Sequence, residues 1–158
     1  MTSTPICPSL SDGERSALEA RWNKHPGMQH MGMRVDLSAS EVVRVYVDPV
    51  QPHHRGGLGT DAVNGAVMAG AFDLTIGLVG HFCNLDRRVG TAQLNIHFIR
   101  PVRGDRFEVL GRLVRAGGSL VFATADLHDQ QGQLCARCDG IVAVTKEPAA
   151  DAEERIAL

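Results

Sequence analysis

Residues 62–81 read AVNGAVMAGAFDLTIGLVGH, and this stretch decides the fold class. Nearly all of its residues are apolar or small, and Asp73 is its only acidic or basic residue apart from the terminal histidine. At the 3.6-residue period of a helix, the bulky side chains spread around the axis, which is typical of a helix that is buried on most sides. We therefore predict one long helix over about residues 62–81, wrapped by a sheet.

One face of this predicted helix carries small residues around a single carboxylate. Ala66, Gly70, Asp73, Gly77 and Gly80 follow one another at spacings of 4, 3, 4 and 3, so they share one side. Each glycine costs about 1 kcal/mol relative to alanine inside a helix, so this face must admit a partner backbone or a ligand closely. Packing alone would explain the glycines but not the acid, since a buried carboxylate is costly. Asp73 is therefore a candidate catalytic residue, with a hydrogen-bonded structural acid and an exposed acid as the alternatives.

The start of the helix adds a second candidate feature. Asn64 is a good N-cap residue and Gly65 follows it. The free N–H groups of a helix N-terminus can stabilise a developing oxyanion. Asn64 and Asp73 lie nine residues apart, which is about 13 Å along the axis. One helix cannot easily bring both features to one carbonyl, but two antiparallel helices from two subunits could.

The rest of the chain predicts an antiparallel sheet. Ser11, with Glu14 three residues on, can cap a short helix that ends near Trp22. A long helix followed by a strand meander implies an α+β fold with five or six strands. We expect an N-terminal segment with a short helix over 1–29, one domain over 30–146 and a polar tail over 147–158. The predicted strands cover 30–37, 41–48, 91–101, 106–115, 120–129 and 134–144, with a loop over 49–61.

The composition narrows the class of protein. The chain has 158 residues and a net charge of −2, so we expect neither nucleic acid nor a membrane as a partner. We read no apolar run of the length of a membrane span and no secretory signal, so we expect a cytoplasmic protein. Cys135 and Cys138 form a CxxC on a predicted strand, which is a poor geometry for a metal site. We find no zinc, P-loop, dinucleotide or nucleophile-elbow motif and expect no metal and no cofactor.

Three segments resemble one known family. Residues 63–73 resemble the central helix of the phenylacetate-pathway (PaaI-like) branch of hotdog thioesterases, in which His-Gly-Gly precedes an Asp at the spacing seen here. Residues 91–101 are similar to the family strand that ends in proline. Gly117-Gly118 and the segment after it resemble the family's glycine-rich turn and strand. The similarity covers about residues 30–145 and implies the hotdog fold, in which a five- or six-stranded antiparallel sheet wraps one long helix.

The resemblance also implies a reaction. It assigns Asp73 as nucleophile or general base, the Gly65 N–H as the group that polarises the thioester carbonyl, and Thr91 as a residue that positions water or the acid. Each site would be shared by two subunits of a homodimer or homotetramer. The sequence departs from the family pattern at Asn64, where the family has His, at Ala66, where it has Gly, and at Leu58, where it has Asn or Gln. Asp61 or a shifted loop is a possible substitute for that last group.

The implied substrate is an acyl-CoA. The family holds coenzyme A phosphates with basic groups at the rim, and Arg100, Arg103 and Arg115 are the best candidates here, with Gly117 and Gly118 near the pantetheine. The leading hypothesis is an acyl-CoA thioesterase.

Two other functions stay open. One is a non-catalytic acyl-thioester binder, because of the departures at Asn64 and Leu58. The other is a hotdog enoyl-CoA hydratase, because Asp48 and His53 have the right separation, although the Asn-Pro of that motif is missing. His54 and His81 are further candidate ligands or bases, but loop histidines are more often merely solvated.

Overall fold

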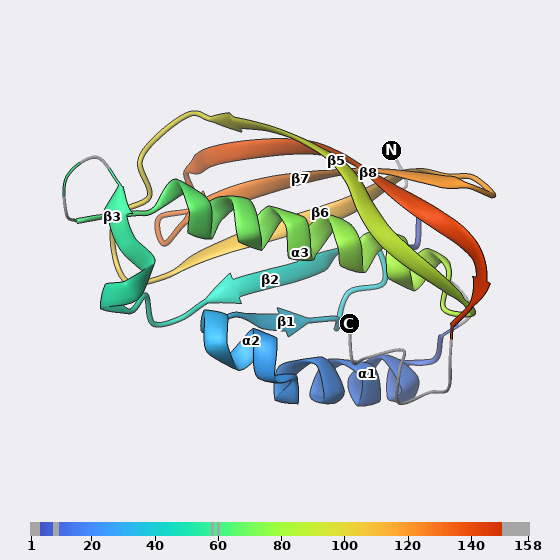
Figure 1. Ribbon diagram of the computed structural model, residues 1–158. Helices are drawn as coiled ribbons and strands as arrows, with labels where there is room; N and C mark the ends of the chain where they lie inside the picture. The colour runs from blue at the N-terminus through green and yellow to red at the C-terminus, as the bar shows by residue number, and fades with distance from the viewer. Residues whose placement is uncertain (1–3, 8–9, 58, 60, 150–158) are drawn as a thin grey trace.

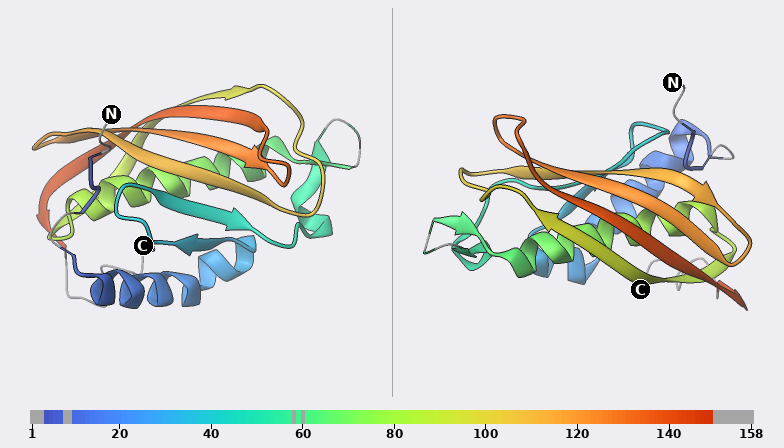
Figure 2. Two further views of the ribbon diagram at one scale, coloured as in Figure 1. Left: turned by 180° about the vertical axis from the view of Figure 1, so that it is seen from behind. Right: turned by 90° about the horizontal axis from the view of Figure 1, so that it is seen from above.

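The computed structural model describes residues 4–7, 10–57, 59 and 61–149 and has the predicted α+β architecture. Its long helix is α3 (Gly65–Cys83). The main strands are β1 (Arg34–Asp36), β2 (Val43–Val47), β5 (Arg87–Phe98), β6 (Phe107–Ala116), β7 (Leu120–Asp129) and β8 (Leu134–Pro148). They form one antiparallel sheet of six strands in the order β1-β2-β6-β7-β8-β5, and α3 lies across one face of it (Figures 1 and 2).

Two helices precede the sheet and run beside β1 (Figure 1). The first, α1 (Asp12–Lys24), begins at the predicted capping box. The backbone N–H of Glu14 donates to the Ser11 hydroxyl, and the backbone N–H of Ser11 donates to the Glu14 carboxylate. The second, α2 (Pro26–Met31), was not predicted. It starts at a proline, which suits a first helical position because that N–H has no acceptor there.

The predicted loop over 49–61 was wrong in part, because it contains regular structure. A 3₁₀ turn, η1 (Pro52–His54), leads into β3 (Arg55–Gly57), which pairs with β4 (Ala62–Val63). The pairing needs a residue without a side chain, since a Cβ at Gly57 would lie 2.5 Å from the carbonyl oxygen of Val63. Because Ala62 and Val63 belong to this hairpin, α3 begins three residues later than predicted.

Strand alternation builds the core between the sheet and α3. Burial alternates from one residue to the next along β2 and the first half of β6, so valines and Phe107 face the helix and charged residues lie on the opposite face. Glycine lets the two layers approach closely. A Cβ at Gly111 on β6 would lie 2.5 Å from the Thr75 side chain of α3, and one at Gly80 would lie 2.4 Å from Val142 on β8. Any larger residue at these positions would push the helix away from the sheet.

The six-stranded sheet wraps α3 as predicted, and it leaves one side of the helix uncovered in the single chain. The residues buried on α3 are Met68, Ala71, Phe72, Thr75, Ile76, Leu78, Val79, Gly80 and Phe82. Ala66 and Asp73 are exposed. α3 is also long and apolar enough to meet the criteria for a membrane span, contrary to our reading of the sequence. Its packing on the sheet is that of a core helix in a globular fold.

The ends of the chain fit the expected segments only loosely. β8 continues to Pro148, so the expected tail over 147–158 begins inside a strand. Residues 150–158 of that tail lie outside the described residues. The boundaries proposed for the N-terminal segment and the domain stay predictions.

Candidate active site

Asp73 lies on the exposed side of α3, in the middle of the small-residue face. Among the described residues, no atom outside the local helix backbone lies within 4 Å of a Cβ built at Gly70, so the helix is open one turn before Asp73. One turn after it, a Cβ at Gly77 would lie 3.3 Å from the Thr91 hydroxyl of β5. The structure therefore brings Thr91 beside the same face as Asp73. The small-residue face is buried at its last member, Gly80, which packs on Val142 and has a structural role.

The N-terminus of α3 supplies a donor group. The Asn64 side-chain oxygen accepts from the N–H of Ala66 at 2.8 Å, which confirms the predicted cap. The N–H groups of Val67 and Met68 donate to the Asn64 carbonyl. Within the described part of the chain, the N–H of Gly65 has no hydrogen-bond acceptor. Asn64 is therefore occupied as a cap, and Gly65 holds the donor that remains available for a ligand.

Phe98 lies next to this donor, and no pattern in the sequence pointed to it. Atoms of its ring lie 3.8 Å from the position of a Cβ on Gly65. Phe98, the last residue of β5, is 57% exposed in the single chain. Phenylalanine is among the residue types most often buried, so this exposure is unusual. An exposed aromatic ring beside a free N–H offers both an apolar surface and a polar contact to one ligand.

A network of arginines fixes the loop that leads into α3. Arg55 donates to the carbonyl of Asp61 at 2.8 Å and to that of Gly104 at 3.1 Å. Arg103 donates to the Asp61 carboxylate at 2.9 Å, and this hydrogen bond lowers the pKa of Asp61. Asp61, the proposed substitute for the family's Asn or Gln, is therefore engaged with Arg103. Leu58 lies outside the described residues.

The candidate coenzyme A residues lie at two opposite ends of the sheet. Arg100 and Arg103 follow β5 near the start of α3, where the N–H of Val63 donates to the carbonyl of Val102. Arg100 also donates to the Leu134 carbonyl at 2.9 Å.

Arg115, Gly117 and Gly118 belong to the β6–β7 hairpin at the other end (Figure 1). There the N–H of Val144 donates to the carbonyl of Ser119, and Val144 pairs with Val89 at the start of β5. A single chain does not bring the two groups of residues together.

The cysteines offer no nucleophile at this site. Cys135 and Cys138 are both buried and free. Burial raises the pKa of the Cys138 thiol to about 11, and the nearby carboxylates of Asp139 and Asp73 add to the rise. A thiol with such a pKa is protonated near neutral pH and is a weak nucleophile. Among the described residues no group of three or more His, Cys, Asp or Glu could hold a metal ion.

The histidines divide into exposed and structural ones. His53 is exposed, as expected for a loop histidine. His54 is only 1% exposed, so its reading as a solvated loop residue was wrong. The turn at Pro52–His54 buries His54 and leaves His53 exposed, and the sequence did not indicate this turn. His81 packs edge-on against Trp22.

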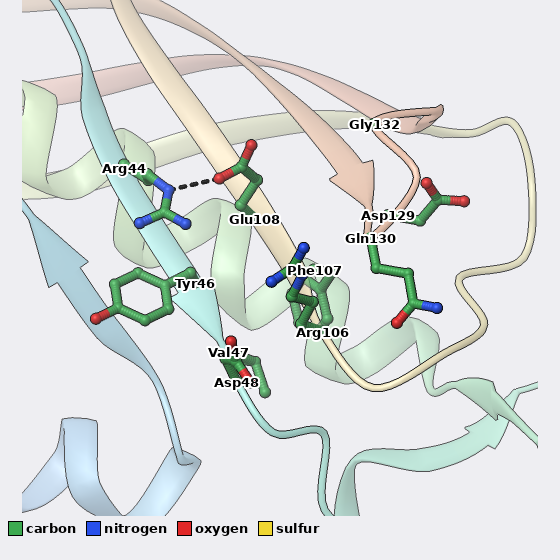
Figure 3. Close-up of a pocket in the computed structure, with 10 residues that line it drawn as sticks. All are labelled: Arg44, Tyr46, Val47, Asp48, Arg106, Phe107, Glu108, Asp129, Gln130 and Gly132. Atoms are coloured by element: carbon green, nitrogen blue, oxygen red, sulfur yellow. Dashed lines mark hydrogen bonds and ion pairs between the residues drawn. The ribbon is translucent and has the colours of Figure 1, made fainter.

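A hollow lies on the face of the sheet opposite α3. It measures about 310 Å³, and Figure 3 shows that Arg44, Tyr46 and Glu108 project into it from β2 and β6. Arg44 already pairs with Glu108 at 2.5 Å and with Asp36 at 3.5 Å. Asp48 also lines this hollow. None of the catalytic candidates on α3 and β5 reaches it, and the Asp48–His53 pair of the hydratase hypothesis is therefore apart from the face that carries Asp73.

Solved structures share this fold, and several of them are described as thioesterases. PaaI from the phenylacetic acid degradation operon of Escherichia coli matches with a TM-score of 0.73 at 15% identity, covering 87% of this chain and 99% of that one. A thioesterase from Haemophilus influenzae matches with a TM-score of 0.72 at 15% identity over 87% of this chain and 92% of that one. Zebra fish thioesterase superfamily member 2 gives 0.71 at 18% identity, over 87% of this chain and all (100%) of the other. The fold is the hotdog fold, as the resemblance implied.

Sequence comparison identifies the family. The family model described as the thioesterase superfamily matches residues 61–136, which include α3 and most of the sheet. The medium/long-chain acyl-CoA thioesterase YigI of Escherichia coli strain K12 is 32% identical over 120 residues, covering 67% of this chain and 77% of YigI. The chain belongs to the thioesterase superfamily and is a thioester hydrolase.

Proposed function

We propose that the protein hydrolyses acyl-CoA thioesters, with Asp73 as nucleophile or general base and the Gly65 N–H as the oxyanion donor. The observation that carries this proposal is the free N–H of Gly65, which lies on a helix whose exposed face also bears Asp73. A carboxylate can attack the thioester carbonyl or remove a proton from water. A backbone N–H aimed at the carbonyl oxygen stabilises the charge that develops on it. Thr91 lies beside the same face and can orient the water or the acid.

Two subunits are needed to complete each site. Gly65 and Asp73 are eight residues apart on one helix, which is about 12 Å, so they cannot both contact one carbonyl group. β5 offers the contact for a second copy, because this strand is hydrogen-bonded on one side only and ends in the exposed Phe98 and Ile99. A free edge of this length readily pairs with another strand. Antiparallel pairing of two β5 edges sets two α3 helices side by side with opposite directions, so that Gly65 of one faces Asp73 of the other.

The same pairing explains the separated coenzyme A candidates. A two-fold axis at β5 exchanges the two ends of the sheet. The end that carries Arg100 and Arg103 in one subunit then lies near the end that carries Arg115 and the Gly117-Gly118 turn in the other. Phosphates of coenzyme A would contact these arginines, with the pantetheine passing the glycine turn toward Gly65. We assign the active protein as a homodimer or a homotetramer on this basis.

We propose medium- or long-chain acyl groups as substrates in the cytoplasm. YigI is named for such substrates. In this chain the side of α3 at Gly70 is open, Phe98 lies against Gly65 at the start of the same helix, and both Phe98 and Ile99 are exposed. These features provide a long apolar path for an acyl chain between two subunits, and burying each methylene contributes about 0.8 kcal/mol.

The test is hydrolysis of a series of saturated acyl-CoAs from acetyl to palmitoyl, followed by thiol release. We expect kcat/KM to rise with chain length into the medium range. Wild-type protein that releases no thiol from any acyl-CoA would refute the proposal. The mass in solution tests the assembly, since a particle of 17.0 kDa at micromolar concentration would exclude the shared site.

A further inference from the structure

His54 is a buried polar residue whose two ring nitrogens both have hydrogen-bond partners. The backbone N–H of Gln51 donates to Nδ1 at 2.9 Å, so Nδ1 carries no proton. Nε2 lies 2.8 Å from the carbonyl oxygen of Met31, which can only accept, so Nε2 carries the proton. The pattern fits the neutral ring with its proton on Nε2, and it fits neither the other tautomer nor the charged form.

These bonds join two segments, the end of α2 and the turn at residues 51–54, which lie about 20 residues apart in the sequence. Through Nε2 the ring holds the last turn of α2, and through Nδ1 it closes η1 (Pro52–His54). The packing is tight, because a Cβ on Gly32, the residue that ends α2, would lie 2.9 Å from the ring. The ring is therefore the point at which the loop before α3 is fastened to the N-terminal helices.

The backbone of His54 continues this connection to the active site. Its carbonyl accepts from the N–H of Asn64 at 2.8 Å, and Asn64 is the N-cap of α3. Asn64 in turn precedes Gly65, whose N–H is the proposed oxyanion donor. The position of that donor thus depends in part on a hydrogen bond to His54, whose side chain the buried contacts hold in place.

We propose that His54 is a positioning residue for thioester hydrolysis: its neutral ring fixes the cap of α3 and thereby aims the Gly65 N–H at the substrate carbonyl. This role rests on the proposed function of Gly65. His54 contacts no reacting atom and acts only through Asn64. Misplacing a catalytic group by about 1 Å can cost up to about 10²-fold in rate, so small movements of this loop have measurable effects.

The surroundings of His54 support the neutral form. Burial lowers the pKa of its ring, and the charges of His53 and Arg55 in the same segment lower it further, whereas the hydrogen bond to Met31 opposes the shift. From α2 the only titratable residue is His30, which is exposed. The hydrogen-bond pattern requires the same state that these neighbours favour.

Two substitutions remove the Nδ1 contact in different ways. His54→Gln keeps an N–H that can donate to Met31 but places no acceptor opposite the Gln51 N–H. Gln51→Pro deletes that N–H and leaves His54 intact; the Gln51 side chain is exposed, and its φ of −90° requires only a small shift, about 10°, to reach the range of proline. His30→Asn, at an exposed position on α2, is the matched control.

The decisive measurement is whether each variant changes kcat or KM on the best acyl-CoA. We expect both variants to lower kcat about 10-fold with KM within about twofold, because the Gly65 N–H acts mainly in the transition state. The control should match wild type. Folding is checked by circular dichroism and by the melting temperature of each variant.

Two results would overturn the inference. One is a folded His54→Gln or Gln51→Pro protein with wild-type kcat, even if its melting temperature is lower, since His54 would then be structural only. The other is a rise in KM without a change in kcat. Failure of the proposed function looks different, because wild-type protein would then release no thiol, or Asp73→Asn would be fully active.

Discussion

Replacing Asp73 by Asn tests the chemistry with little disturbance of the fold. From the sequence we expected the variant to fold as well as the parent or better, because a buried charge would be removed. The structure removes that reason, since Asp73 is exposed in the single chain and has open space at Gly70. An exposed substitution of this kind changes the free energy of unfolding by no more than about 0.5 kcal/mol. Its effect on turnover should be at least about 10²-fold, which corresponds to about 2.7 kcal/mol of lost transition-state stabilisation.

The assay compares kcat, KM and the melting temperature of wild type and Asp73→Asn on the best acyl-CoA. Asp139→Asn is the matched control, because Asp139 is exposed on β8 next to the inward-facing Cys138 and therefore points away from α3. The control should keep full activity. If Asp73→Asn turns over within about threefold of wild type, Asp73 is neither nucleophile nor base. If it fails to fold, its carboxylate has a structural partner in the assembled protein, and the reasoning from its exposure is wrong.

Three further predictions concern the helix face, the substrate and pH. Gly70→Ala should stabilise the fold by up to about 1 kcal/mol but lower the rate of hydrolysis. Gly80→Ala should destabilise the fold by about 1–3 kcal/mol, because its Cβ would lie 2.4 Å from Val142. Thermal unfolding and kcat/KM, measured together, distinguish the two effects. Arg115→Glu should raise KM for acyl-CoA about fivefold, for about 1 kcal/mol of lost attraction, and the difference should shrink in high salt; an unchanged KM would remove Arg115 from the binding site. The pKa of His54 is lowered in the folded protein, so the unfolded chain binds more protons just below about pH 6.5. The free energy of unfolding should therefore fall as pH drops through that range. A melting temperature that falls equally in wild type and His54→Gln between pH 7.5 and 5.5 would contradict this.

The sequence predicted the regular elements well where local chemistry determines them. The capping box at Ser11, the cap at Asn64 and the long apolar helix each depend on a few neighbouring residues. The hairpin turn at Gly117 was equally clear, because glycine pairs separate strands reliably. The short β3–β4 hairpin was missed because Arg55–Gly57 has almost no side-chain signal and forms a strand only by pairing with Ala62 and Val63.

The candidate site could be predicted only where one residue contrasts with its neighbours. Asp73 is conspicuous as a charge in an apolar helix. His54 is not, since its neighbour His53 has the same side chain and only the folded loop buries one and exposes the other. The sequence left the exposure of Asp73 open as one of several alternatives, because an apolar helix has the same pattern whether its second covering layer is its own sheet or another subunit.

The sheet order also determines when each part of the molecule can form as the chain is made. β5 is flanked in the sheet only by β8, and Phe98 and Arg87 pair with Ala136 and Pro148, far downstream in the chain. β2, β6 and β7 can already assemble on α3 while β5 has no strand beside it. The strand that carries Thr91 thus enters the sheet last, because its one partner strand, β8, is synthesised only after β6 and β7. A ribosome-stalled chain that lacks β8 should therefore hold a folded helix and a sheet of β1, β2, β6 and β7, yet leave β5 accessible to proteases and to chaperones.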